Sequence, residues 1–220
     1  MATSTIHQVC GQSLHLHPHK AVWWEEGRTL FLADLHLGKG AHFRKAGIPA
    51  PRALADADLR RLDQLLGAFD IDAVFFLGDL FHSDHNGEWA GLGELLARHP
   101  KPAFHLVRGN HDILAEEHYN SAGLSLLNEP FFCDPFVLSH YPLATPVQGY
   151  YNLAGHLHPA VILNGKGRQH LRLPCFYFRP DQAVLPAFGA FTGHACLDPH
   201  SEDAVFVIVE DRVLKIEQRS

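Results

Sequence analysis

Side chains that can bind metal ions occur at five places in the sequence, each directly after a short apolar run. The candidate groups are Asp34 and His36, Asp79 and His82, Asn110 and His111, His140, and His156 and His158. Oxygen and imidazole donors suit divalent ions such as Mn, Zn, Fe or Co, and no cysteine stands among them to favour a copper(I) or iron–sulfur site. These are more ligands than one ion needs, so the pattern predicts a pair of ions about 3.5–4 Å apart that share a carboxylate.

The residue between the two ligands is leucine in both the Asp-Leu-His and the His-Leu-His segment, at Leu35 and Leu157. An extended chain directs alternate side chains to opposite sides, so we expect each leucine to be buried while its two neighbours share one side. Gly78 and Gly109 stand directly before the second and third groups. Because glycine has no Cβ, we expect the backbone at these two positions to approach the ions closely.

Three short apolar runs precede the first three groups, at residues 29–33, 73–77 and 103–107. Each run ends at once in a polar loop, which is typical of buried parallel strands. Segments with helical spacing of leucine begin at residue 52 and at residue 87 and separate the runs. The alternation predicts a wound α/β sheet, in which the carboxyl ends of the strands bring the three groups together.

The second half of the chain, after about residue 120, has short strand-like pieces separated by Pro, Gly and Asn, which predicts mostly antiparallel sheet. Two alternating runs at residues 205–217 predict a hairpin, and residues 1–24 predict an opening strand or hairpin. No linker or internal repeat separates the halves. We therefore expect a single domain over residues 1–220, an α/β fold with two β-sheets in a sandwich flanked by helices.

The composition limits the partners and the location of the protein. Of 220 residues, 46% are hydrophobic and 19% charged, as in a folded rather than a disordered chain. A net charge of −6 gives no overall attraction to a polyanion, so contact with nucleic acid would need a local basic patch. The four cysteines form no CxxC pair, and no signal peptide or membrane-spanning run is found. We expect free thiols, a cytoplasmic location and no contact with a membrane.

In order, the five groups resemble the DxH, GDxx[DH], GNH[DE], single-H and GHxH motifs of the calcineurin-like metallophosphoesterase superfamily. The resemblance implies a metallophosphoesterase-type sandwich that hydrolyses phosphate esters with two bound metals. By the roles that the family assigns, Asp34, His36 and His158 hold the first ion, and Asn110, His140 and His156 hold the second. Asp79 bridges the two ions, and His111 contacts the phosphate and assists the leaving oxygen.

The second motif separates branches of this superfamily. Phosphoprotein phosphatases continue it with an Asp and an Arg, where this chain has His82 and Ser83. "GDLFH" is instead similar to the motif of double-strand-break-repair nucleases, so His82 is paired with His111 in handling substrate. The stretch "LADLHLGKGAHFRKAGIPAP", with "GDLFHS", "RGNHD" and "LAGHLHP", resembles bacterial ligase-associated DNA damage response endonucleases. That resemblance implies a manganese-dependent phosphodiesterase that acts on DNA in repair, with an ATP-dependent DNA ligase and associated repair enzymes.

Basic residues beside the motifs are candidates for binding phosphates that flank the scissile one. They are Lys39 and Arg44, with His42 and Lys45, after the first motif, and Arg108 before the third. A solvated surface position would explain each of them equally well. Likewise, His82 could bond to His85 or Asp84 in a polar turn, and Asp112 is expected to cap a helix that begins near Ile113.

Three functions remain open from the sequence. The first is a dinuclear phosphodiesterase or endonuclease that acts on DNA. The second is a small-molecule phosphoesterase, acting for example on cyclic nucleotides or dinucleotides, which the acidic net charge favours. The third is a non-catalytic scaffold of the same fold, which the complete set of ligands and His111 disfavours.

Overall fold

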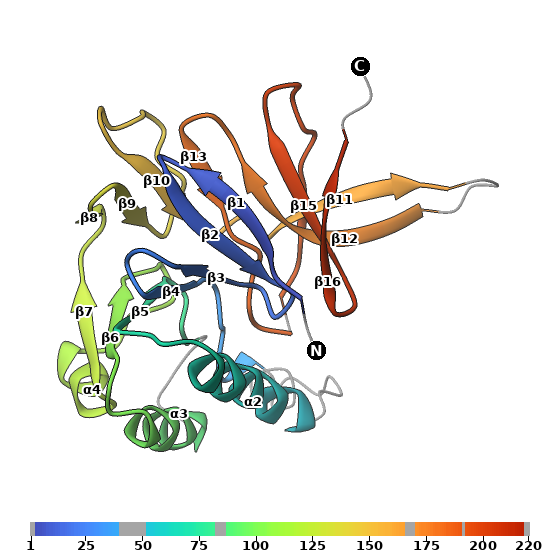
Figure 1. Ribbon diagram of the computed structural model, residues 1–220. Helices are drawn as coiled ribbons and strands as arrows, with labels where there is room; N and C mark the ends of the chain where they lie inside the picture. Colours follow the sequence, from blue (N-terminus) through green and yellow to red (C-terminus); the bar gives the residue numbers. More distant parts are fainter. Residues whose placement is uncertain (1–2, 40–51, 82–86, 166–169, 191, 218–220) are drawn as a thin grey trace.

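The computed structural model describes residues 3–39, 52–81, 87–165, 170–190 and 192–217. Two β-sheets pack face to face, and the helices lie against the outer face of the first sheet (Figure 1). The expected α/β fold, a two-sheet sandwich flanked by helices, is confirmed.

The first sheet has seven strands in the order β1-β2-β3-β4-β5-β6-β7. Its elements and helices are β1 (Thr5–Val9), β2 (Gln12–His17), β3 (Ala21–Trp24), β4 (Thr29–Leu32), α2 (Arg52–Ala68), β5 (Ala73–Leu77), α3 (Gly87–Arg98), β6 (Ala103–Val107), α4 (Glu116–Ser121) and β7 (Leu124–Leu127). Strands β1 to β4 pair antiparallel, which confirms the opening hairpin, and β4 to β7 pair parallel. The three predicted parallel strands are β4, β5 and β6.

Strands β4 and β5 are buried on both faces, which explains their continuous apolar sequences. Leu32 and Phe76 belong to the core that the leucines of α2 and α3 complete, whereas Phe31 and Phe75 belong to the core between the sheets. Consecutive side chains of a strand point to opposite faces, so each strand contributes to both cores. This double burial holds the ends of the parallel strands in place.

The second sheet has nine strands, seven of them in the order β14-β11-β12-β13-β10-β9-β8. Its strands are β8 (Phe131–Cys133), β9 (Phe136–Ser139), β10 (Tyr151–Ala154), β11 (Pro159–Asn164), β12 (His170–Phe178), β13 (Gln182–Val184), β14 (Ala195–Cys196), β15 (Ala204–Val209) and β16 (Arg212–Ile216). Most neighbours run antiparallel as predicted, including the hairpin β15–β16. However, β10 runs parallel to both β9 and β13, and β11 runs parallel to β14.

The four cysteines are free, as expected from their spacing. Cys175 is fully buried in β12, and burial raises the pKa of its thiol to about 12. Its role is therefore packing rather than reactivity. Among the residues that the structure describes, no helix is long and apolar enough to cross a membrane.

Candidate active site

Loops at the carboxyl ends of β4, β5 and β6 carry the first candidate ligands. They are Asp34 and His36, Asp79, and Asn110 with His111. Because these strands are parallel neighbours, their ends meet at one edge of the sheet, as predicted. Asp34 N donates to Gly78 O at 3.2 Å, and His36 N donates to Asp79 O at 2.9 Å. The first two loops are therefore held to each other by backbone hydrogen bonds.

The second sheet supplies three histidines in the same way. His140 follows β9, and His156 and His158 follow β10. Since β9 and β10 are also parallel neighbours, these ends meet as well. His156 N donates to Asp34 Oδ2 at 2.9 Å, which ties a loop of the second sheet to a carboxylate of the first. Candidate ligands as far apart in the sequence as Asp34 and His158 are thereby brought together, where the loops of the two sheets meet.

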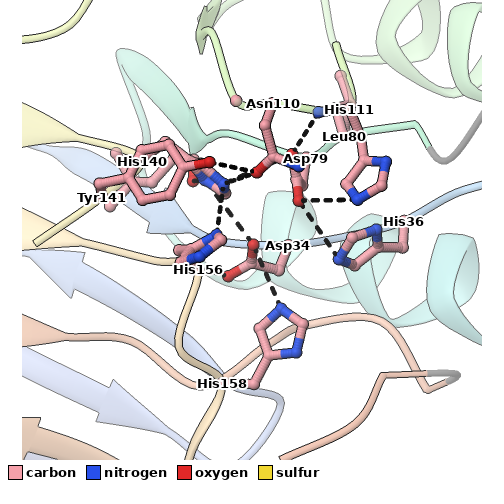
Figure 2. A network of polar contacts seen from close by, with 12 residues as sticks. Asp34, His36, Asp79, Leu80, Asn110, His111, His140, Tyr141, His156 and His158 are labelled. Atoms are coloured by element: carbon pink, nitrogen blue, oxygen red, sulfur yellow. Dashed lines mark hydrogen bonds and ion pairs between the residues drawn. The ribbon is translucent and has the colours of Figure 1, made fainter.

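The donor atoms form two groups of three (Figure 2). The groups are Asp34, His36 and His158, and Asp79, His140 and His156, with the donor atoms of each group within 4.8 Å of one another. Asp79 Oδ1 is 3.5 Å from His140 Nε2, and Asp79 Oδ2 is 3.7 Å from His36 Nε2. A carboxylate with one oxygen toward each group is suited to being shared by two ions.

Asn110 and His111 reach the same place from the third loop. Asn110 Oδ1 is 3.0 Å from His140 Nε2, beside the second group. His111 N donates to Asp79 Oδ1 at 2.9 Å, while Nε2 of its ring is 4.0 Å from Asp79 Oδ2. The His111 side chain is 40% exposed. Its imidazole is therefore open to solvent, and Figure 2 shows it beside Asp79 and His36.

His156 has an electrostatic environment that favours its neutral form. Burial lowers its pKa, and the neighbouring His140 lowers it further, against the opposite effect of Asp34 and Asp79. A neutral imidazole keeps its lone pair for a ligand, so metal binding here requires no proton to be removed near neutral pH.

The ligand loops are not extended, contrary to the prediction made from the leucine spacers. The residues with a positive φ include Asp34 (55°), His36 (48°), Asp79 (50°), His156 (68°) and His158 (49°). Side chains other than glycine rarely adopt this region, at a cost of about 1–3 kcal/mol each, and such strain clusters at functional sites. The ligands share one side because the backbone turns at each of them, rather than through alternation along a strand.

The two leucine spacers have different environments. Leu35 is 2% exposed and belongs to the core beneath the helices, as predicted. The prediction for Leu157 is wrong, because its side chain is 37% exposed. Its loop lies at the end of the second sheet, and among the described residues no helix covers the outer face of that sheet.

Gly78 and Gly109 lie in close contact with candidate ligands, while their predicted approach to the ions themselves stays a prediction. A Cβ on Gly78 would lie 2.1 Å from His140 Nδ1, and a Cβ on Gly109 would lie 2.4 Å from Asp79 N. Gly78 also has a φ of +79°, which favours glycine. Any larger residue at either position would push a candidate ligand out of place.

Asp112 does not cap a helix near Ile113, because the next helix, α4, begins at Glu116. The Asp112 side chain is instead buried and accepts hydrogen bonds from Gly109 N at 2.9 Å and from Leu80 N at 3.1 Å. Burial raises the pKa of this carboxyl to about 6. Asp112 therefore joins the second and third ligand loops by satisfying backbone N–H groups that both loops leave free.

Two residues of the site have no role in the sequence prediction. Tyr141 donates from its hydroxyl to Asn110 Oδ1 at 2.9 Å, and its ring centre is 4.2 Å from that of His156. Glu129 accepts a hydrogen bond from His140 N at 2.6 Å and one from Tyr141 N at 3.3 Å. The position of Tyr141 directly after a motif histidine is a signal that could have identified it. Glu129 precedes a Pro in a loop and carries no such signal.

The structure describes only two of the basic residues that were predicted to bind phosphate, Lys39 and Arg108. Lys39 is half-buried close enough to Asp34 and Asp79 for both to raise its pKa, although burial has the larger effect and lowers it. Arg108 is exposed and lines a hollow together with Asn110 and Tyr141. His82 and Arg44, like His42 and Lys45, lie outside the described residues.

Comparison with known proteins agrees with this geometry. Residues 27–183 match the model of the family described as calcineurin-like phosphoesterase. The chain belongs to this family. A solved structure, the Pseudomonas putida nuclease MPE, is similar to 97% of this chain over 100% of its own length, with 34% sequence identity and a TM-score of 0.82. No curated protein sequence matches the chain. As a calcineurin-like phosphoesterase, the protein is a metal-dependent hydrolase of phosphate esters.

The site of this calcineurin-like phosphoesterase fits divalent ions. Asp34 Oδ1 is buried and makes no hydrogen bond with any residue that the structure describes. A buried carboxylate oxygen that accepts no hydrogen bond is costly, and a cation bound between it and the neighbouring His158 Nε2, 3.4 Å away, would remove that cost. The remaining donors are imidazole nitrogens and a second carboxylate, a set that suits Mn, Zn, Fe or Co.

Proposed function

We propose that this protein is a dinuclear metal-dependent phosphodiesterase, an endonuclease that cleaves DNA during repair together with an ATP-dependent DNA ligase and associated enzymes. The position of Asp79 carries the proposal, because one of its oxygens faces His140 of its own group and the other faces His36 of the first group. The likeness to a nuclease over nearly the whole chain supports DNA as the substrate. The sequence motifs shared with ligase-associated endonucleases support a role in repair.

The proposed metal ligands follow the two groups of donors. Asp34, His36 and His158 hold one ion, Asn110, His140 and His156 hold the other, and Asp79 is shared. Manganese is the expected metal, with zinc, iron or cobalt as alternatives, because sites of this kind rank metals by availability as well as by ligand type. When bound, the ions supply positive charge that polarises the phosphoryl group and lowers the pKa of a water molecule.

His111 is proposed as the residue that contacts the phosphate and gives a proton to the leaving oxygen. Its backbone N–H is hydrogen-bonded to Asp79, which fixes the position of the residue. Its ring is exposed to solvent and can therefore contact substrate. His82, which lies outside the described residues, is proposed to handle substrate together with His111. Lys39, Arg44 and Arg108 are proposed to bind the phosphates on either side of the scissile one.

The experiment is hydrolysis of bis(p-nitrophenyl) phosphate by metal-free protein that is reconstituted in turn with Mn, Zn, Fe, Co and Mg. Asp79→Asn serves as the matched variant, because it keeps the size of the side chain and removes the charge that two ions would share. We expect activity that depends on metal and is lost in Asp79→Asn with an unchanged circular dichroism spectrum. Full activity of Asp79→Asn, or of the metal-free protein, would contradict the proposal.

The substrate is tested next with single-stranded and nicked DNA beside cyclic nucleotides and dinucleotides. Cleavage inside a DNA strand supports the endonuclease, whereas turnover of the small molecules alone supports a small-molecule phosphoesterase. The ligase connection is tested with a nicked duplex whose 3′ oxygen carries a blocking group joined by a phosphodiester bond, so that hydrolysis at that oxygen leaves the free 3′ hydroxyl that sealing needs. We expect an ATP-dependent ligase to seal that duplex only after this protein has acted on it.

A further inference from the structure

A pocket of about 210 Å³ lies on the outer face of the second sheet, the face that the helices do not cover. It is lined by Gln182 and Val184 of β13 and by the apolar side chains of Leu157, Pro142 and Leu197, among others. The alternate residues Ala183 and Leu185 pack into the core between the sheets, so Gln182 and Val184 face outward. This pocket is separate from the two groups of metal donors.

The rim of the pocket belongs to the same loops as the candidate ligands. Leu157 stands between His156 and His158, and Pro142 stands two positions after His140. The exposure of Leu157, which departs from its burial predicted from the sequence, is explained by its place in this rim. The pocket therefore borders the loops that carry His140, His156 and His158.

The pocket combines apolar walls with a few polar groups. Gln182 is 9% exposed, and its Oε1 makes no hydrogen bond with the described residues. A buried acceptor of this kind needs a donor, which a ligand amino group would supply. Arg179 and Asp198 also line the pocket, so a cation and a carboxylate are both present to bind the polar edge of a ligand.

The volume limits the ligand. Pockets for drug-sized molecules measure roughly 300–1,000 Å³, so this one holds a smaller, flat group. A nucleobase has apolar faces for the leucine walls, and adenine, cytosine and guanine each carry an amino group on the edge. We propose that the pocket receives one nucleobase of the DNA strand, next to the scissile phosphate at the metals. This inference rests on the proposed function and adds a site of base recognition to it.

The first test uses the metal-loaded protein and single-stranded oligonucleotides with one abasic residue at successive positions around the cleavage site. We expect one position beside the scissile phosphate at which loss of the base lowers kcat/KM by about tenfold, as for the loss of one base contact. Little change is expected at the other positions. Equal sensitivity at all positions, or at none, would overturn the proposal.

The second test alters the pocket. Leu197→Trp fills it from one wall, Arg179→Ala removes its cation, and Arg212→Ala, an exposed arginine of β16 outside the pocket, is the matched control. We expect the ratio of oligonucleotide to bis(p-nitrophenyl) phosphate kcat/KM to fall about tenfold in the first two variants and to stay unchanged in the control. In Leu197→Trp, the abasic residue should no longer lower the rate at the sensitive position.

The design separates failure of the pocket from failure of the proposed function. Absence of any hydrolysis of bis(p-nitrophenyl) phosphate counts against the function, whereas an unchanged ratio in an active Leu197→Trp counts against the pocket alone. Binding of the labelled oligonucleotides to metal-loaded His111→Ala, measured by fluorescence anisotropy, gives a readout that needs no turnover. Equal affinity for intact and abasic strands would overturn the proposal, and so would base-dependent affinity that survives Leu197→Trp. Thermal unfolding checks that Leu197→Trp folds. If it does not fold, the ratio measured for Arg179→Ala decides, because Arg179 is exposed and its replacement leaves the fold intact.

Discussion

The two sheets enclose the candidate site from opposite sides. They differ in how far the side chains next to the ligands are exposed. On the side of the first sheet, Leu35 is 2% exposed beneath the first ligand loop, and leucines of α2 and α3 complete the core outside β4 and β5. On the side of the second sheet, Tyr141 is 41% and Leu157 37% exposed, each next to a candidate ligand in sequence. One side is closed by helices, and the other is open to solvent (Figure 1).

This difference separates two tasks. Both cores hold the ends of β4 and β5, so the closed side can keep strained ligands such as Asp34 and Asp79 in place. The open side contributes histidines as well, but its neighbouring side chains remain free to meet substrate. We therefore expect substitutions of the ligands on either side, and of the buried residues on the closed side, to affect chemistry or stability strongly. Substitutions of the exposed side chains on the open side should affect recognition.

The largest effect is expected for His111→Ala, which removes the exposed imidazole of the third loop of the first sheet. Loss of a group that transfers a proton in the transition state costs about 10²–10⁴-fold in rate. The measurement is kcat for cleavage of an oligonucleotide with saturating metal, because its sugar oxygen is a poor leaving group that needs the proton, whereas p-nitrophenolate leaves without one. His118→Ala, in α4 and outside the site, is the control. Activity of His111→Ala near that of the unaltered protein would remove the assignment of His111 as the proton donor.

The second prediction compares the two leucine spacers directly. Leu35→Ala should lower the free energy of unfolding by about 2–5 kcal/mol, because it leaves a cavity in a closed core. Leu157→Ala should lower it by no more than about 0.5 kcal/mol, because the side chain is partly solvated already. Urea denaturation followed by circular dichroism measures both. Equal losses of stability would mean that the open side is as rigidly packed as the closed one.

Much of the site could be predicted from the sequence, because each ligand stands directly after a strand that the sequence also predicts. Asp34, Asp79 and Asn110 each follow a buried strand, and parallel pairing of those strands is enough to bring them to one edge. The rule extends further than predicted, since β9 and β10 also pair in parallel and deliver His140 and His156 in the same way. The short strands of the second half gave no sign of this, because their spacing is compatible with hairpins.

The remaining features depend on contacts between distant segments. The positive φ of His36 goes with a hydrogen bond from its N–H to Asp79 O, a partner that its local sequence does not indicate. Asp112 bonds to Leu80 N across two loops instead of starting a helix. Leu157 is exposed because, among the described residues, no helix covers the outer face of the second sheet. The spacing in the sequence is the same as for Leu35 and cannot distinguish the two.

The third prediction concerns pH and the closed side. His17 in β2 is buried, accepts a hydrogen bond from His19 N at its Nδ1, and packs edge-on against Phe69. Burial, with a further contribution from His19, lowers its pKa to about 4. In the unfolded chain the pKa is about 6.5, so the unfolded state binds the proton more readily. The stabilisation by neutral His17 is therefore complete above about pH 6.5 and is lost progressively as the pH falls toward 4.

His17→Asn keeps an acceptor for His19 N without the titration. We expect its free energy of unfolding to fall less between pH 7 and pH 5 than that of the unaltered protein, as measured by urea denaturation at each pH. His170→Asn, an exposed histidine of β12 on the open side, is the control and should keep the full pH dependence. The same dependence in all three proteins would place the titrating group elsewhere.

Among the effects on activity, the smallest is expected for Tyr141→Phe on the open side. The variant loses the hydrogen bond from the tyrosine hydroxyl to Asn110 Oδ1 but keeps the ring against His156. A hydrogen bond of this kind contributes about 0.5–1.5 kcal/mol, which corresponds to roughly a 2–10-fold change. Because Asn110 is a proposed ligand, we expect the manganese concentration that gives half-maximal activity to rise by this factor. The value of kcat should stay the same. Tyr141→Leu, which loses the ring as well, should shift that concentration further. A loss of kcat in Tyr141→Phe as large as that of His111→Ala would show that the open side also carries the chemistry.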